Sequence, residues 1–174
     1  DFTEDVDTAS VKATYYLANT SGRDVTLDLV FVAPGSQALA VTLGDTTLPV
    51  AEVKAAIPPE WASSDIVLDP RTGEEYFLDG FVRQVQTRSW SFQAQIPAGT
   101  PAVLSVGYRA PAGYDRDRAD YVLRHSVYSL GPARGWAGFG TLEVSAKVPA
   151  AYSLLASPAL SRTGDDGRVA EYTG

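Results

Sequence analysis

The chain has 174 residues and a formal net charge of −7, and 45% of its residues are hydrophobic. A chain of this length and composition buries about 70% of the surface that its unfolded form exposes, which excludes a disordered protein. The 14 basic residues are scattered among 21 acidic ones, and this excludes a nucleic-acid partner because phosphate binding requires a basic stripe. The absence of cysteine excludes disulfides and thiolate metal ligands. No apolar run reaches the length of a membrane-spanning helix.

The N-terminal part of the chain predicts a short lead-in followed by two strands. Residues 1–10 are acidic and weakly patterned, so we interpret them as a lead-in or linker to a single domain over residues 11–174. Apolar and polar residues alternate over Val11–Ala18, with Tyr15 on the apolar side and Tyr16 on the polar side. The same alternation recurs over Val25–Val32. A period of two is typical of a strand with one buried face and one face in water.

Two hairpins are predicted next. The segments Gln37–Leu43 and Thr46–Val53 flank Gly44-Asp45, a two-residue turn signal. Further along, Ile66–Leu68 and Tyr76–Val85 flank a loop that contains Pro70 and Gly73.

The clearest strand pattern in the chain lies between Arg88 and Arg109. In its first arm every second residue is apolar, and these residues are Trp90, Phe92, Ala94 and Ile96. A Pro-Ala-Gly-Thr turn at 97–100 separates this arm from a second alternating arm. The pattern predicts an antiparallel hairpin with one buried face.

The C-terminal part begins with a polar loop over Ala110–Ala119 and then predicts four more strands. These are Asp120–Leu130, Leu142–Val148, Tyr152–Ala156 and Arg168–Tyr172, with a Gly-Asp-Asp-Gly turn at 164–167 between the last two. Roughly ten strands with frequent turn signals, and no helix long enough to connect parallel strands, indicate an all-β fold. We expect an antiparallel β-sandwich, immunoglobulin-like or jelly-roll-like.

Composition and chain ends suggest a source and a location. Alanine, valine, glycine and arginine are abundant while asparagine occurs once, which favours a GC-rich bacterial genome. The polar ends favour a fragment of a longer protein. Since sandwich domains of this kind are common in exported proteins, we expect an extracytoplasmic location, whether secreted, periplasmic or at the cell surface.

Catalytic signals are weak. A serine-type triad needs a histidine base, and the single histidine, His125, precedes Ser126 on a predicted strand, where neighbouring side chains point to opposite faces. A glycosidase needs two carboxyl groups flanking the scissile bond, and Glu143 is the cleanest single candidate on a predicted strand. A carboxylate-dependent hydrolase, or an accessory domain of one, therefore stays an alternative function.

An acidic loop is the best candidate for a metal site. Asp115, Asp117 and Asp120 lie within six residues, and clustered carboxylate oxygens are the ligands that calcium prefers. The loop lacks the glycine and glutamate of an EF-hand, and the intervening Arg116 and Arg118 can pair with the acids instead. Asp165-Asp166 is a second, weaker calcium candidate. Calcium is thus the only cofactor that the sequence suggests.

A glycine-rich loop at 131–140 is the best candidate for a contact site. It carries Trp136 and Phe139 among small residues, with Arg134 alongside, and such side chains anchor protein and ligand interfaces. The alternative is that Trp136 folds back to cap an open end of the sandwich. Separately, Asn19-Thr20-Ser21 matches the N-glycosylation pattern, but these residue types also form turns by bonding to their own backbone, and we expect a turn.

These observations predict a non-catalytic β-sandwich module that contacts a protein or a polysaccharide in a bacterial envelope or secreted protein. A hydrolase domain is one alternative, and a purely structural spacer is another.

Overall fold

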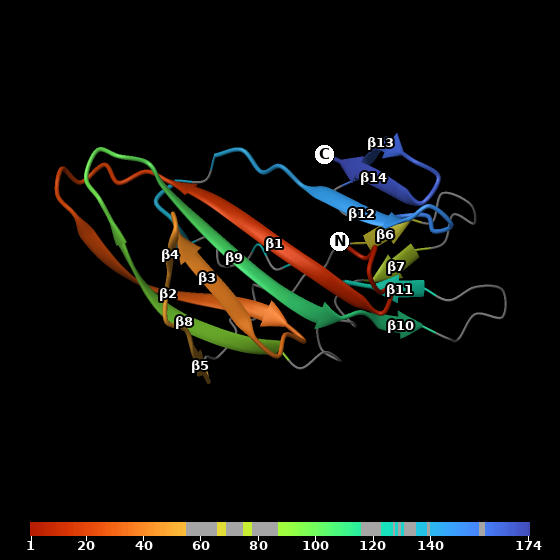
Figure 1. Ribbon diagram of the computed structural model, residues 1–174, viewed down its shortest axis with the longest axis horizontal. Coiled ribbons are helices and arrows are strands. Elements are labelled where there is room, and N and C mark those ends of the chain that lie inside the picture. Colours follow the sequence, from red (N-terminus) through yellow and green to blue (C-terminus); the bar gives the residue numbers. More distant parts are fainter. Residues whose placement is uncertain are drawn as a thin grey trace. The chain divides into compact units, whose positions relative to one another are not determined.

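The computed structural model describes residues 1–54, 66–68, 75–77, 87–115, 123–126, 128, 130, 135–138, 140–156 and 159–174. The described chain is all-β, and three antiparallel sheets of three or four strands hold ten of its strands, beside two two-stranded ribbons (Figure 1). The predicted all-β, sandwich-like fold is confirmed. No helix in the described ranges is long and apolar enough to cross a membrane.

The strands in chain order are β1 (Thr8–Leu17), β2 (Val25–Pro34), β3 (Leu39–Leu43), β4 (Thr46–Thr47), β5 (Ala51–Val53), β6 (Ile66–Leu68), β7 (Glu75–Phe77), β8 (Thr87–Ile96), β9 (Ala102–Pro111), β10 (Gly113–Asp115), β11 (Leu123–His125), β12 (Ser145–Pro149), β13 (Ser161–Asp165) and β14 (Val169–Thr173).

The chain divides into two compact units. One, the sandwich unit, comprises Ser10–Ala56 and Thr87–Ala110. The other, the three-segment unit, comprises Asp1–Ala9, Ile57–Gln86 and Pro111–Gly174.

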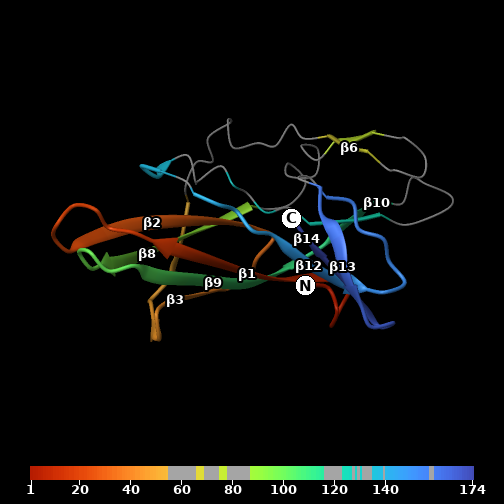
Figure 2. The same ribbon diagram turned by 90° about the horizontal axis from the view of Figure 1, so that it is seen from above.

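The sandwich unit consists of two sheets, with strand orders β1-β9-β3-β4 and β2-β8-β5. Strands β2 and β8 pair along their whole lengths, from Val25 opposite Ile96 to Pro34 opposite Thr87. Figure 2 shows this pair as one layer and β1 with β9 as the other. The chain passes from one sheet to the other between β1 and β2 and again between β8 and β9.

The core of this unit lies between the two sheets, where the predicted alternation places it. The edge-to-face contact of Phe31 from β2 with Tyr108 from β9 joins the layers, with ring centroids 5.9 Å apart. The buried apolar residues are Leu17, Val32, Ala33, Val41, Phe92, Ala94, Ile96, Ala102, Leu104, Val106, Tyr108 and Ala110. The faces predicted for 11–18, for Val25 to Phe31 and for Phe92 to Ile96 are confirmed. The alternation fails at Val32 and its cross-strand partner Ser89, which lie on the faces predicted to be in water and are buried.

The predicted hairpin between Arg88 and Arg109 is wrong, although both of its strands exist. Strand β8 pairs with β2 and β5, whereas β9 pairs with β3 and has β1 as its other neighbour. The turn at 97–100 therefore crosses from sheet to sheet. Alternation fixes which face of a strand is buried but not which strand lies beside it, so a hairpin and a crossing turn have the same pattern.

The hairpin closed by Gly44-Asp45 is confirmed, because Leu43 pairs with Thr46 across it. Gly44 has a φ of 55°, which a residue without a β-carbon adopts at little cost. The second strand of this hairpin is shorter than predicted, since Pro49 has no N–H for the ladder. After Pro49 the chain forms β5 in the opposite sheet.

In the three-segment unit, β14 lies between β12 and β13 in a small antiparallel sheet. Its buried cluster holds Val148, Ala170 and Tyr172, and four half-buried residues pack against it: Phe2, Ala146, Leu154 and Leu160. Two ribbons, β6-β7 and β10-β11, complete the described strands of the unit. The β6-β7 ribbon confirms the second predicted hairpin.

Two predictions in this unit are wrong. Residues 152–156 are not a strand, because Tyr152 donates its N–H to the Pro149 carbonyl at 2.9 Å in a turn. The partner of β14 is instead β13, a polar segment with no alternating apolar residues. In addition, β10 occupies part of the predicted loop at 110–119, and within the described part of 120–130 only β11 is a strand.

Candidate functional site

The glycine-rich loop is described only in part. Trp136 is half-buried and is flanked by the exposed Gly135 and Ala137. The other two predicted contact residues, Arg134 and Phe139, lie outside the described residues. A half-buried Trp136 fits a partner contact and an end cap equally, so its role stays a prediction.

The predicted calcium loop is also described only at its start. Asp115 ends β10, where its backbone is paired with that of Leu123 in β11, and Asp117 and Asp120 lie outside the described residues. Among the residues that are described, no group of three or more histidine, cysteine, aspartate or glutamate side chains is placed to hold a metal ion. His125 ends β11 opposite Gly113, and Glu143 lies exposed two residues before β12.

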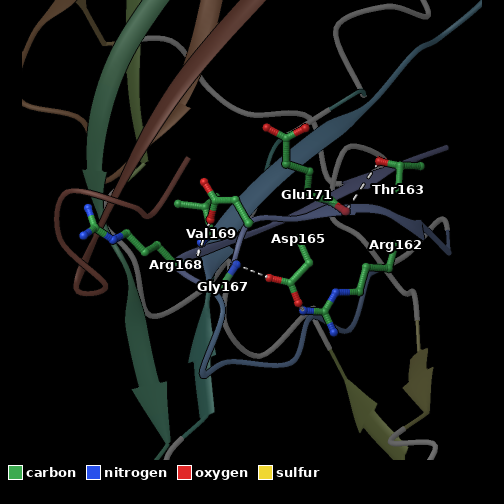
Figure 3. A network of polar contacts seen from close by, with 8 residues as sticks. Arg162, Thr163, Asp165, Gly167, Arg168, Val169 and Glu171 are labelled. Carbon is green, nitrogen blue, oxygen red and sulfur yellow. Dashed lines mark hydrogen bonds and ion pairs between the residues drawn. The ribbon is translucent and has the colours of Figure 1, made fainter.

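The second calcium candidate, Asp165-Asp166, is a hydrogen-bonded turn between β13 and β14 (Figure 3). One oxygen of Asp165 accepts the Gly167 N–H at 2.8 Å, and the other pairs with the Arg162 guanidinium. Asp166 Oδ1 accepts two backbone N–H groups, from Arg168 at 2.8 Å and Val169 at 2.7 Å. Both carboxylates therefore form contacts that hold the turn.

The electrostatics of this turn do not suit acid catalysis. The backbone hydrogen bonds from Val169 and Arg168 lower the pKa of Asp166 below its usual range. A general acid requires the opposite shift, so that the carboxyl keeps its proton near neutral pH.

In the sandwich unit, burial raises the pKa of the Tyr108 phenol, whose hydroxyl has no hydrogen-bond partner among the described residues. A phenol that retains its proton in this way cannot serve as a general base.

The single asparagine forms the predicted turn rather than an open glycosylation acceptor. Its Nδ2 donates to the carbonyl oxygens of Arg23 at 2.7 Å and Ile96 at 3.0 Å. Its Oδ1 accepts from the N–H and the hydroxyl of Ser21. The amide nitrogen that glycosylation would modify is therefore committed to two backbone carbonyls.

This turn is tied to the turn that follows β8. The Gly99 N–H donates to the Asn19 carbonyl at 3.4 Å, and the Ala98 N–H donates to Asp24 Oδ1 at 2.9 Å. Together with the Asn19 to Ile96 bond, these contacts join the two chain crossings at one end of the sandwich. We call this group of bonds the end clamp.

In the three-segment unit, Arg124 of β11 links two other segments. Its Nε lies 2.7 Å from Asp7 Oδ1, and its guanidinium lies 5.6 Å from the centre of the Tyr152 ring. The bond to Asp7 raises the pKa of Arg124, so the group is a fixed cation. Asp7 contacts the edge of the guanidinium and Tyr152 lies against its face. We therefore interpret this cluster as a structural contact that holds the three segments together.

The outer face of the β1-β9-β3-β4 sheet has a different character. Tyr16 of β1 is 81% exposed, the largest value of any large hydrophobic residue in the described chain, and Val103 of β9 is 38% exposed. The other outward positions alternate with buried or half-buried ones along β1, β3 and β9, and Thr47 of β4 lies opposite Thr42. These positions are Lys12, Thr14, Ala40, Thr42, Thr47, Ser105, Gly107 and Arg109. We call these ten residues the Tyr16 face.

The strand pairing makes this face continuous. Thr42 of β3 lies opposite both Ser105 of β9 and Thr47 of β4. Strands β1 and β9 are bracketed by two backbone bonds, from Ala112 N–H to the Asp7 carbonyl and from Gly99 N–H to the Asn19 carbonyl. Strands β1, β9 and β3 lie side by side in Figure 1.

Sequence reasoning placed Tyr16 on the wet face of its strand but did not single it out. The signal was available, because Tyr16 is an aromatic residue whose neighbours on the same face of its own strand, Lys12 and Thr14, are polar. Only the sheet order shows that Val103 and the hydroxyl residues of β9 and β3 share its surface.

Comparison with known proteins does not identify a relative: no family model, no curated protein and no solved structure matches this chain.

Proposed function

We propose that this chain is a non-catalytic, extracytoplasmic β-sandwich module of a bacterial envelope or secreted protein, and that it contacts a protein or a polysaccharide through the Tyr16 face. The observation that carries the proposal is the 81% exposure of Tyr16 on a regular sheet surface, beside the exposed Val103. Hydration of so large an aromatic ring is unfavourable, and burial against a partner would recover that free energy.

The composition of the face supports contact rather than chemistry. Tyrosine provides a large contact area with few rotatable bonds, while serine and threonine provide adaptable hydrogen bonds, the combination found in antibody paratopes. Because these side chains stand on paired strands, little backbone order has to be gained on binding.

The described carboxylates give the hydrolase alternative less support. Besides those of the Asp165-Asp166 turn, Glu171 pairs with Lys147 across β12 and β14 at 2.5 Å, and Asp28 accepts from Gln93 at 2.8 Å. Each of these carboxylates has a structural partner. A calcium site at the Asp115 loop and a contact role for Trp136 remain separate predictions.

The test is binding by the intact chain to a panel of defined polysaccharides and of immobilised peptides, measured by biolayer interferometry. We expect at least one ligand class to bind and Tyr16→Ala to weaken that binding about tenfold. The matched control is Val30→Ala, which removes an exposed apolar side chain from the other sheet and should bind as the original chain does.

Binding that survives Tyr16→Ala unchanged would contradict a role for this face. Circular dichroism of each variant checks that the sandwich still forms, which is expected because both side chains lie in water.

A further inference from the structure

The Tyr16 face differs in charge from the rest of the molecule. The chain carries 21 acidic and 14 basic residues, yet none of the ten described residues of this face is acidic. Two of them, Lys12 and Arg109, are basic and exposed. Arg109 has a partner within the chain, so Lys12 is the basic side chain that this face offers to an anion, on a protein whose net charge is −7.

The face also offers hydroxyl groups in adjacent strands. Thr14, Ser105 and Thr42 come from three neighbouring strands, and neighbouring strands lie about 4.8 Å apart. Ser105 and Thr42 lie directly opposite each other and Thr14 is on the next strand, and hydroxyls at this spacing can exchange hydrogen bonds with a sugar chain, since each group both donates and accepts.

The aromatic ring completes the set. A ring that stands clear of its neighbours offers its negative face to polarised C–H groups, such as those on one side of a pyranose ring. Stacking on Tyr16, hydrogen bonding to the hydroxyls and ion pairing with Lys12 each match a different part of an acidic sugar.

We propose that the Tyr16 face binds an anionic polysaccharide, with Tyr16 stacking on a sugar ring and Lys12 pairing with a carboxylate. This inference rests on the proposed contact function and narrows its partner to one chemical class. An acidic polypeptide would satisfy the charge but has less use for these hydroxyls, and a neutral glucan would satisfy the ring and hydroxyls but not the charge.

Three soluble probes separate these chemistries: polygalacturonate, which is an anionic polysaccharide, dextran, which is a neutral one, and poly-L-glutamate, which is an anionic polypeptide. Each is titrated against the intact chain at 50 mM salt, with the intrinsic fluorescence and biolayer interferometry as readouts. We expect polygalacturonate to bind at least tenfold more tightly than either of the others, with the difference from dextran shrinking at 500 mM salt as the charges are screened.

Two pairs of variants locate the contact. Tyr16→Ala should weaken polygalacturonate binding about tenfold and Lys12→Gln about threefold, while the controls Val30→Ala and Lys54→Gln should leave it unchanged. Lys54 is an exposed lysine after β5, so its substitution removes the same charge from outside the face.

The outcomes distinguish this inference from the function on which it rests. Equal binding of dextran, or equal binding of poly-L-glutamate, overturns the anionic polysaccharide while a loss with Tyr16→Ala would still support the contact function. No binding of polygalacturonate, or binding that Lys54→Gln weakens as much as Lys12→Gln, also overturns the inference. If Tyr16→Ala binds every probe as the original chain does, both proposals fail.

Discussion

The described strands of the two compact units are held together by different means. Of the sixteen buried apolar residues in the described chain, twelve belong to the sandwich unit. The sheet of the three-segment unit has a cluster of three buried residues, and its strands are also joined by the Lys147–Glu171 ion pair and the Asp165-Asp166 turn. Long strands with period-two alternation thus build a core, whereas short polar strands depend on turns and cross-strand pairs.

This difference has a thermodynamic consequence. Burial of apolar surface scales with area, about 25 cal/mol for each Å², whereas an exposed ion pair contributes less than about 1 kcal/mol. We therefore expect the sandwich strands to resist opening and the β12-β14-β13 sheet to open more readily.

The largest expected effect compares one substitution in the two units. Val106 of β9 is fully buried, while Val148 of β12 belongs to the small cluster. Val106→Ala should lower the free energy of unfolding by about 2–3 kcal/mol and Val148→Ala by about 1–2 kcal/mol, because a larger core collapses less completely around the lost methyl groups. Urea unfolding of both variants measures this.

Amide hydrogen exchange then assigns each loss to a unit. Equal losses, or a larger loss for Val148→Ala, would show that the two units are equally well packed and would remove the basis of the comparison.

The next effect concerns the end clamp. Asn19→Ala removes two bonds to backbone carbonyls, and the partly buried Ile96 carbonyl loses its partner, so we expect a loss of about 2 kcal/mol in the free energy of unfolding. Thr20→Ala is the matched control, since Thr20 is the exposed neighbour in the same turn. Thermal unfolding of the two variants is the measurement, and an equal shift in both would mean that the hydrogen bonds of the Asn19 side chain contribute nothing to stability.

Much of the fold follows from local pattern. The faces of β1 and of most of β2 and β8 were predictable because alternation decides which side chains enter the core, but the burial of Val32 and Ser89 on the other face was not. The β3-β4 hairpin was predictable because Gly44-Asp45 closes it within two residues. Strand partners were not predictable, since the turn at 97–100 has the same composition whether it closes a hairpin or crosses between sheets.

Strand β13 and the Tyr16 face were missed for related reasons. Residues 161–165 are Ser-Arg-Thr-Gly-Asp, with no apolar side chain to reveal a strand, and they pair because the following turn directs them onto β14. The candidate site required knowledge of which strands are neighbours, because Tyr16 and Val103 are far apart in sequence. A pattern confined to one strand cannot show a surface made by four.

The smallest expected effect tests the turn of the three-segment unit. Its hydrogen bonds lower the pKa of Asp166 from the ordinary value of 3.8, so the folded state binds this proton less readily than the unfolded state does. The stabilisation from Asp166 is therefore fully present above the unfolded pKa and is lost as the pH falls through the folded pKa.

We expect the β13-β14 amides to lose protection from exchange below about pH 4 in the original chain. Asp166→Asn keeps an oxygen acceptor but cannot titrate, so its protection should be lower at neutral pH and should change less on acidification. Identical pH profiles for the two proteins would mean that the turn is held by its backbone alone, and the contrast between a unit built on burial and one built on polar turns would then have to rest on the Lys147–Glu171 pair.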